Sequence, residues 1–389
     1  MLARGLAVWS QLLSIPWFAL ELGAGPAELG VVTALLFAPT LVVSPLGGVL
    51  ADRVDRGKVL LATQAGSFLL SVTLAAIAWA GIGSLSLVAL MALVFGVLTA
   101  IELPVRQAYV SELVPREDLT SAVSLHATAW NTTRFVGPAL AGLLIATLGV
   151  TASFLLASVA ILMVTVSIAV LERYRRPDRA APGPTDGVLR SLGQGIAFAL
   201  ADRRIRWSLA YVTAVGILGI QTFQTLAPVY VTDVLGFGGG GYGAFIAMWG
   251  AGAVSAAYTI TAVARGDRRR WLQVGSLVMA GALLVLAGTN VGPVAFVAAF
   301  VLGFAQISVV QNAMITIQVA APDAMRGRVM GLYTTIFSGV SPLGAILAGT
   351  IAEAVGVEPT FIVAGLGLAV VAVVGAVGLR HVSLAPSGG

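Results

Sequence analysis

The sequence contains no cysteine, only two histidines and few charged residues. Without cysteine, the chain can form neither a disulfide framework nor a thiolate metal site. The histidines, His126 and His381, lie too far apart in sequence to suggest a metal centre, so no metal site is predicted. Charged residues make up 10% of the 389 residues, against about a quarter in soluble domains, which excludes a water-soluble protein of this length.

Long apolar stretches take the place of those missing charges. Hydrophobic residues make up 58% of the chain, and the charges fall in short clusters between apolar segments. A net charge of +5 raises the question of a nucleic-acid partner, which would require basic residues gathered on one surface. They lie instead in connections between apolar segments, a pattern typical of membrane topology, so no nucleic-acid partner is predicted.

The apolar stretches predict an all-α membrane protein with twelve transmembrane helices. At about 20 apolar residues per crossing, the spans are expected near residues 5–22, 28–51, 58–80, 84–106, 120–146, 148–171, 206–232, 241–264, 271–289, 292–317, 327–352 and 356–379. The first is interpreted as a span, because it lacks the small-residue cleavage site of a signal peptide. Its short length leaves open whether residue 1 is the natural start.

The positions of the basic residues predict the orientation of these spans. An even number of spans puts both termini on one side, and alternate connections, such as 23–27 and 236–240, contain no lysine or arginine. The opposite connections carry the basic residues, among them Arg53, Arg56, Lys58 and Arg173. Since basic loops remain in the cytoplasm, we expect a multi-pass protein of the cell membrane with both termini cytoplasmic.

One long basic connection divides the spans into two sets of six. The predicted domains are a bundle at 1–171, a cytoplasmic linker at 172–205, a second bundle at 206–380 and a tail at 381–389. Within the linker, 188–201 carries an apolar stripe at helical spacing, which predicts an amphipathic helix on the membrane surface.

An internal repeat supports this division. Shifting the chain by 207 residues places Gly137 on Gly344, Gly142 on Gly349 and Gly149 on Gly356. The repeat predicts that the two bundles are copies of one fold. Coincidence among helices rich in alanine and glycine is the alternative.

Two motifs resemble those of a known transporter family. Residues 47–58 read GGVLADRVDRGK, and residues 131–142 read NTTRFVGPALAG. The first resembles the signature loop of the major facilitator superfamily, and the second, with 104–116 and 326–331, resembles its branch of enterobactin and macrolide exporters. Gly57 replaces a basic residue of the signature, and Thr133 and Ala141 replace glycines of the antiporter pattern.

This resemblance implies two pseudo-symmetric six-helix bundles and a conformational latch near the signature loop. Asp52 would accept hydrogen bonds from the start of the eleventh helix near Arg326, and Arg56 would pair with Glu102. The predicted latch residues are Asp52, Arg53, Arg56, Glu102 and Arg326. The alternative is that the arginines only fix topology.

Two charged residues are candidates for a substrate or proton pathway. Arg134 is expected at mid-membrane with Asn131 on its face, where a charge must face protein or a water-filled cavity. A structural arginine bonded to backbone carbonyls is the alternative. Glu102 is predicted either to pair with Arg106 at the cytoplasmic rim or to carry a proton.

Amides and small residues complete the predicted site. Within a membrane, amides face the protein interior, where they line a cavity or join helices. The predicted cavity amides are Gln11, Gln221, Gln224, Gln306, Gln311 and Asn312, and the residues predicted to allow close helix crossings are Gly137, Pro138, Gly142, Gly344 and Gly349.

These features predict a secondary active transporter and not an enzyme. The chain has no nucleotide-binding motif, so no cofactor is expected and a proton gradient is the predicted energy source. Export of a drug-like or siderophore-like small molecule by alternating access is predicted, with a nutrient uptake carrier or a lipid or lysolipid translocator as alternatives. The expected partners are a small-molecule substrate and membrane lipid, and the chain is expected to work as a monomer. Substrate identity, transport direction and coupling ion are not determined by the sequence.

Overall fold

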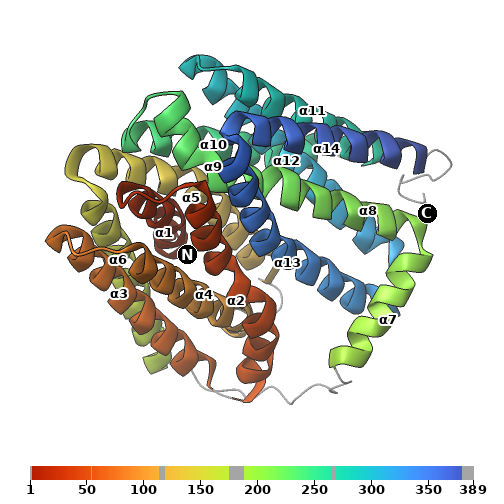
Figure 1. Cartoon of the computed structure of the whole chain (residues 1–389). Helices are drawn as coiled ribbons and strands as arrows, with labels where there is room; N and C mark the ends of the chain where they lie inside the picture. The colour runs from red at the N-terminus through yellow and green to blue at the C-terminus, as the bar shows by residue number, and fades with distance from the viewer. Residues whose placement is uncertain (1, 54, 114–118, 175–187, 264–267, 379–389) are drawn as a thin grey trace. The chain divides into compact units, whose positions relative to one another are not determined.

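The computed structural model describes residues 2–53, 55–113, 119–174, 188–263 and 268–378. Helices are the only regular elements in these ranges (Figure 1). They are α1 (Leu2–Glu21), α2 (Pro26–Arg53), α3 (Arg56–Ala80), α4 (Leu85–Leu113), α5 (Leu119–Leu148), α6 (Val150–Tyr174), α7 (Val188–Ala201), α8 (Arg203–Ala214), η1 (Val215–Gln221), α9 (Thr222–Val229), η2 (Tyr230–Val234), α10 (Gly239–Val263), α11 (Arg268–Gly288), α12 (Gly292–Ala320), α13 (Asp323–Val355) and α14 (Val357–Gly378).

Each predicted span corresponds to a helix or to one continuous helical segment. The segments α8, η1, α9 and η2 follow one another without a break and together form the seventh span. Within the described ranges, nine helical stretches are long and apolar enough to cross a membrane. Three predicted spans, α1, α5 and α10, are not among the nine. In α1 the reason is its buried polar residues Arg4, Ser10, Gln11 and Ser14, which lower the hydropathy of a helix that is enclosed by protein.

Packing divides the chain into two units. Unit 1 is Met1–Pro182 with Val231–Ala247, and unit 2 is Gly183–Tyr230 with Met248–Gly389. The division after Pro182 falls within the linker expected at 172–205. The segment Val231–Ala247 belongs to unit 1, although the sequence placed it in the second bundle. Because the start of α10 packs on α5, that assignment follows tertiary contacts and not chain order.

Unit 1 is built around α1. This helix packs against α5 and α6, while α2 packs on α4 and α3 lies beside α6 (Figure 1). Buried residues occur on every side of α1, which marks a central helix. By contrast, α6 exposes Leu155, Val159, Leu162 and Val166, an apolar face that suits contact with lipid.

Unit 2 has a comparable arrangement. The helix α11 packs between α12 and α14, and α13 contacts η1, α9 and α7 (Figure 1). The bounds of α7 are those predicted for the amphipathic helix, and Gly195 of α7 packs on the backbone of Arg328 in α13. Ile196 and Leu200 on α7 remain exposed, as expected for a helix with one face toward a membrane surface.

The ends of α5 and α13 repeat one another. Leu148 ends α5 and Val355 ends α13, and these residues are 207 positions apart, as in the sequence repeat. Each is followed by a glycine with positive φ, 82° at Gly149 and 94° at Gly356. A residue with a Cβ is strained in that conformation, so the same turn chemistry ends the corresponding helix in each unit.

Candidate functional site

A buried charge cluster joins the start of α1 to the second half of α4. Glu102 is 1% exposed, Arg4 2% and Arg106 9%. Arg4 donates from Nε to Glu102 Oε1 at 2.8 Å and from Nη2 to Glu102 Oε2, and Arg106 donates from Nη1 to Oε1 at 3.0 Å. One carboxylate thus accepts three charge-assisted hydrogen bonds from two helices, which is how a charge is accommodated away from water.

The local sequence explains the contact of Glu102 with Arg106 but not its contact with Arg4. Glu102 and Arg106 are four residues apart on α4, so they share one face of the helix. Arg4 comes from 98 residues earlier in the chain. The predicted first span began at residue 5, but α1 begins at Leu2, which places Arg4 inside the helix and against α4. The sequence signal for this contact was the carboxylate of Glu102. A buried carboxylate requires further partners besides the neighbour on its own helix.

Aromatic rings extend the cluster towards Arg134. The guanidinium carbon of Arg106 lies 5.4 Å from the centroid of the Trp130 ring, and that of Arg134 lies 5.3 Å from the Trp9 ring. The two tryptophans are 6.2 Å apart and tilted by 54°. Cations over ring faces are stabilised by the ring quadrupole. The side chains of α1, α4 and α5 therefore form one row, in the order Arg106, Trp130, Trp9 and Arg134.

The structure adds burial to the expectations about these charges. The predicted pair of Glu102 and Arg106 forms on α4, and both side chains are buried inside unit 1. Arg134, which was expected at mid-membrane, is half-buried, whereas Arg4 and Arg106 are buried. Sequence position along a span gives depth in the membrane but not burial in the protein, which depends on neighbouring helices.

The predicted latch is described only in part. Asp52 and Arg53 belong to α2, but their side chains lie outside the described residues. Arg56 is the half-buried first residue of α3, and the exposed Arg326 donates from Nε to the Gln318 carbonyl at 3.2 Å. The latch therefore stays a prediction.

The structure explains the departure from the signature loop at Gly57. Here Asp55 caps α3 by accepting from the Lys58 amide at 3.2 Å. A Cβ on Gly57 would collide with the carboxylate of Glu172, which also accepts a hydrogen bond from the Tyr109 hydroxyl at 2.7 Å. A basic side chain at position 57 would have to displace Glu172 from this contact.

The predicted cavity amides divide into two groups. Three of them join helices or bond within one: Gln11 donates to Ser71 on α3, Gln306 accepts from Trp249 Nε1 at 2.9 Å, and Asn312 donates to the Ser308 carbonyl at 2.8 Å. The other side chains described are the buried Gln221 and the half-buried Gln224 and Gln311. The side chain of Asn131 lies outside the described residues.

Gln221 ends a stretch of π-helix that the sequence did not reveal. The wider turns η1 and η2 lie on either side of α9, and Thr222 Oγ1 donates back to the Ile217 carbonyl at 3.2 Å. Such segments occur often at functional sites, because they leave a helix locally underpacked and able to rearrange. Hydrophobic periodicity over so few residues cannot distinguish this geometry from an α-helix.

The predicted packing residues lie at tight helix contacts. A Cβ on Gly137 would meet Trp9, and one on Gly344 would meet Gln221 and the backbone of Ile217. A Cβ on Gly142 would collide with the Cα of Gly243, which also approaches the carbonyl of Pro138 within unit 1. Gly349 is buried on α13.

No group of three or more histidine or acidic side chains suited to a metal occurs within the described residues.

Comparison with known proteins identifies the family. A family model described as a transmembrane secretion effector, a branch of the major facilitator superfamily, matches residues 2–384. The chain belongs to the major facilitator superfamily.

Similar proteins of this superfamily match over almost the whole chain. The staphyloferrin A transporter of Staphylococcus aureus is 26% identical over 368 residues, which cover 93% of this chain and 90% of that protein. The multidrug efflux pump Tap of Mycobacterium tuberculosis is 26% identical over 392 residues, covering 97% of this chain and 91% of that one.

Solved structures show the same major facilitator fold. The D-xylose–proton symporter superposes with a TM-score of 0.74 at 16% identity, covering 96% of this chain and 95% of that one. A bacterial homologue of the human lysosomal transporter Spinster, inward-facing and occupied, superposes with a TM-score of 0.72 at 13% identity, covering 97% and 96%. The predicted fold class is confirmed, and this superfamily member is a multi-pass membrane transporter of small molecules, not an enzyme.

Proposed function

We propose that this transporter exports a bulky amphiphilic small molecule in exchange for protons, and that Glu102 carries the proton. One observation carries the proposal: of the acidic side chains that the structure describes, only Glu102 is buried. An ionisable group enclosed by membrane helices usually serves a substrate or ion pathway. Export is supported by the relative named a multidrug efflux pump.

The ion pairs of Glu102 provide a way to couple protons to movement. Its charge attracts Arg4 on α1 and Arg106 on the same helix, so the carboxylate holds α1 against α4. Adding a proton removes that attraction, and separating the pair exposes the carboxylate to a proton. Proton binding and rearrangement of α1 thus favour each other, as alternating access requires.

The substrate would contact amides and aromatic rings more than charges. In this proposal Gln221, Gln224 and Gln311 of unit 2 contact the substrate. Within unit 1, Arg134 and Asn131 belong to the substrate or proton pathway, and the latch at Asp52 responds to the same cycle. The π-helical turns beside Gln221 allow the seventh span to adjust to ligands of different shape. Such a lining suits a mostly uncharged, amphiphilic molecule.

Proteoliposomes test the coupling independently of protein orientation. With an antiporter, a fluorescent amphiphilic dye accumulates on the acidic side of the membrane, and with a symporter it accumulates on the alkaline side. We expect accumulation in vesicles with an acidic interior. Because the bacterial exterior is the acidic side, antiport corresponds to export in the cell. Accumulation only in alkaline vesicles would instead identify an uptake carrier.

The variant that tests Glu102 keeps the charge of the cluster unchanged. Two arginines and one glutamate sum to +1, and the double variant Arg4→Gln with Glu102→Gln leaves Arg106 alone at the same +1. We expect this variant to exchange dye down its gradient but not to accumulate it. Glu28→Gln, at an exposed carboxylate of α2, is the matched control and should accumulate dye normally. Full accumulation by the double variant would exclude Glu102 as the proton carrier.

The same vesicles distinguish a lipid translocator of this fold. A translocator would move a fluorescent lipid between leaflets and leave the dye outside. We expect movement of the dye.

A further inference from the structure

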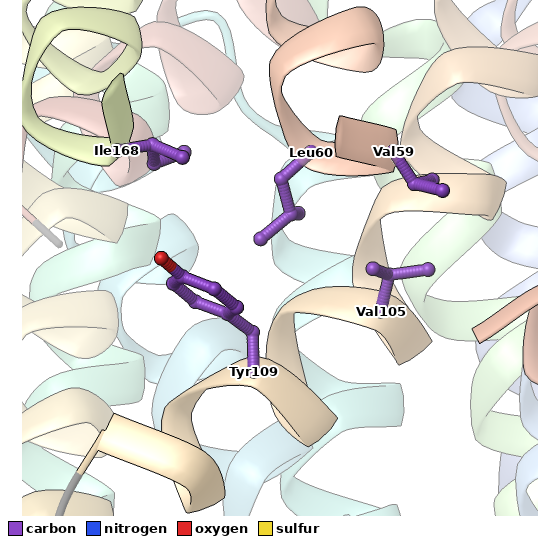
Figure 2. Close-up of a cluster of buried hydrophobic side chains, with 5 residues drawn as sticks. All are labelled: Val59, Leu60, Val105, Tyr109 and Ile168. Carbon is purple, nitrogen blue, oxygen red and sulfur yellow. The ribbon is translucent and has the colours of Figure 1, made fainter. Parts of the chain in front are cut away.

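The charge cluster opens into a cavity inside unit 1. Its volume is about 300 Å³, and it lies among α1, α3, α4 and α6. Arg4, Arg106, Glu102 and Gln64 form its polar end. Its remaining wall is largely apolar and includes Leu60, Tyr109 and Ile168, which Figure 2 shows converging from α3, α4 and α6.

The polar end has an excess of positive charge over negative charge, and it has hydrogen-bond donors without acceptors. Arg4 and Arg106 supply two positive charges against the one negative charge of Glu102, which leaves +1. All three hydrogen bonds of the cluster end on Glu102, while Arg4 Nη1 and Arg106 Nε are buried without a partner in the described part of the chain. Buried unpaired donors and an uncompensated charge are costly, so this end of the cavity favours an anion.

The buried amide of Gln64 also favours a ligand with acceptor oxygens, independently of the ion pairs. Its side chain is 1% exposed, and neither its amide nitrogen nor its amide oxygen has a partner within the described residues. Buried amides are normally hydrogen-bonded, and an amide beside two guanidinium groups can donate to an oxygen that they also bind. The three side chains together offer donors to a group with two or more acceptor oxygens.

The entrance of the cavity identifies where such a group would come from. Met163, Ser167 and Leu171 line it at intervals of four residues on α6, and all three are exposed. They belong to the helix whose outer face is apolar and suited to lipid. A volume of 300 Å³ corresponds to roughly ten waters at about 30 Å³ each, enough for a head group and the first carbons of a chain.

We propose that this cavity binds the oxyanion of an anionic amphiphile that enters sideways from the bilayer. A phosphate or carboxylate would accept hydrogen bonds from Arg4, Arg106 and Gln64, and its aliphatic chain would leave past Met163 and Leu171. The ligand would neutralise the excess charge of the cluster. This site does not depend on the direction or coupling of transport, and its test measures binding without transport.

Native mass spectrometry of the purified full chain tests the site. The probes are phosphatidylglycerol, which is anionic, phosphatidylcholine, which carries the same phosphate with a compensating cation, and inorganic phosphate as competitor. We expect phosphatidylglycerol to be retained in preference to phosphatidylcholine and not to be displaced by millimolar phosphate. Equal retention of the two lipids would overturn the proposal, and displacement by phosphate would overturn its lipid source.

Two variants locate the binding. Gln64→Leu removes an amide that makes no hydrogen bond within the described protein, and Ser167→Phe obstructs the entrance from an exposed position. Gln64→Leu should weaken retention of phosphatidylglycerol about tenfold, the factor expected when a hydrogen bond to a charged group is lost. Ser167→Phe should also weaken retention, because its ring obstructs the path of the lipid. Two different positions are used so that misfolding of one variant does not decide the result.

Matched controls make the same chemical changes elsewhere. Gln273→Leu removes an amide whose nitrogen is also buried without a partner in the described chain, but in unit 2. Val166→Phe adds a ring to the exposed face of α6 beside the entrance. Both controls should retain the lipid as the unmodified protein does. Wild-type retention by Gln64→Leu and Ser167→Phe would show that the lipid binds elsewhere.

Discussion

At the scale of single residues, Glu102 is the centre of the buried charge cluster of unit 1. It accepts hydrogen bonds from Arg4 and Arg106, and Arg106 also lies over Trp130. Each arginine therefore has a different set of partners: Arg4 depends on Glu102, whereas Arg106 also has a ring. The charge balance of three side chains predicts how the protein responds to losing each one.

Removing the glutamate should destabilise the protein more than removing an arginine. Glu102→Gln leaves two adjacent buried guanidiniums at +2, so we expect a loss of about 3–5 kcal/mol, as for other broken buried pairs. Arg4→Gln leaves the neutral pair of Glu102 and Arg106 and should cost about 1–2 kcal/mol, the worth of its hydrogen bonds. Thermal unfolding of the purified proteins measures the order. An equal or larger loss for Arg4→Gln would show that the charge balance does not govern the cluster.

At the scale of helices, burial separates those that form the site from those that face lipid. The central helix α1 carries Arg4, Trp9 and Gln11, all of which contact another helix of unit 1. Polar residues of this kind lower the hydropathy of a span that lipid does not contact. Small residues have the complementary role, because they let two helix backbones approach closely.

The crossing of α5 with the first turn of α10 depends on two facing glycines. Gly142→Ala would place a Cβ against the Cα of Gly243, a backbone atom that no side-chain rotation can move away. We expect a loss of about 1–3 kcal/mol, as in other overpacked contacts. Thermal unfolding of the purified variant measures it.

The control for this change is Gly281→Ala on α11. An added Cβ there meets nothing within 4 Å, and alanine favours a helix by about 1 kcal/mol over glycine. Its stability should stay the same or rise. If Gly142→Ala were as stable as this control, the glycine pair would not determine the crossing.

At the scale of the whole molecule, the distribution of charge predicts the orientation in the membrane. The connections at 81–83 and 236–240 carry no lysine or arginine, whereas those at 54–58 and 264–270 carry several. Basic connections stay in the cytoplasm, so we propose that both termini lie there. The Arg4, Glu102 and Arg106 cluster is then on the cytoplasmic half, since the start of α1 and the end of α4 point to the same side.

The absence of cysteine makes this orientation directly testable. Because the 389-residue sequence contains no cysteine to react, a single introduced cysteine reports its own side of the membrane. Ile82→Cys and Lys58→Cys both lie at exposed positions, at opposite ends of α3. A membrane-impermeant maleimide should label Ile82→Cys in intact cells and Lys58→Cys only after permeabilisation. The reverse labelling would place the termini outside.

The sequence by itself determined which segments form the spans and which segment forms the amphipathic helix. Hydropathy is a property of consecutive residues, so each predicted span falls on a helix or on one continuous helical segment, and the helix at 188–201 has the predicted bounds. The ends of the spans differ by up to seven residues, at the end of α4. It also identified Glu102, Arg134 and the packing glycines as residues to examine. These are single residues whose chemistry is unusual in an apolar helix, and no partner has to be known to notice them.

Only the tertiary structure decided which residues these groups contact. Arg4 reaches Glu102 across 98 residues, Arg134 lies on Trp9, and Gln11 bonds to Ser71 on another helix. The sequence likewise did not reveal the cavity or Gln64 beside it, whose side chain has no hydrogen-bond partner among the described residues. The physical reason is that hydropathy sets which segments enter the membrane, whereas the partner of a buried charge depends on how helices far apart in the chain pack together.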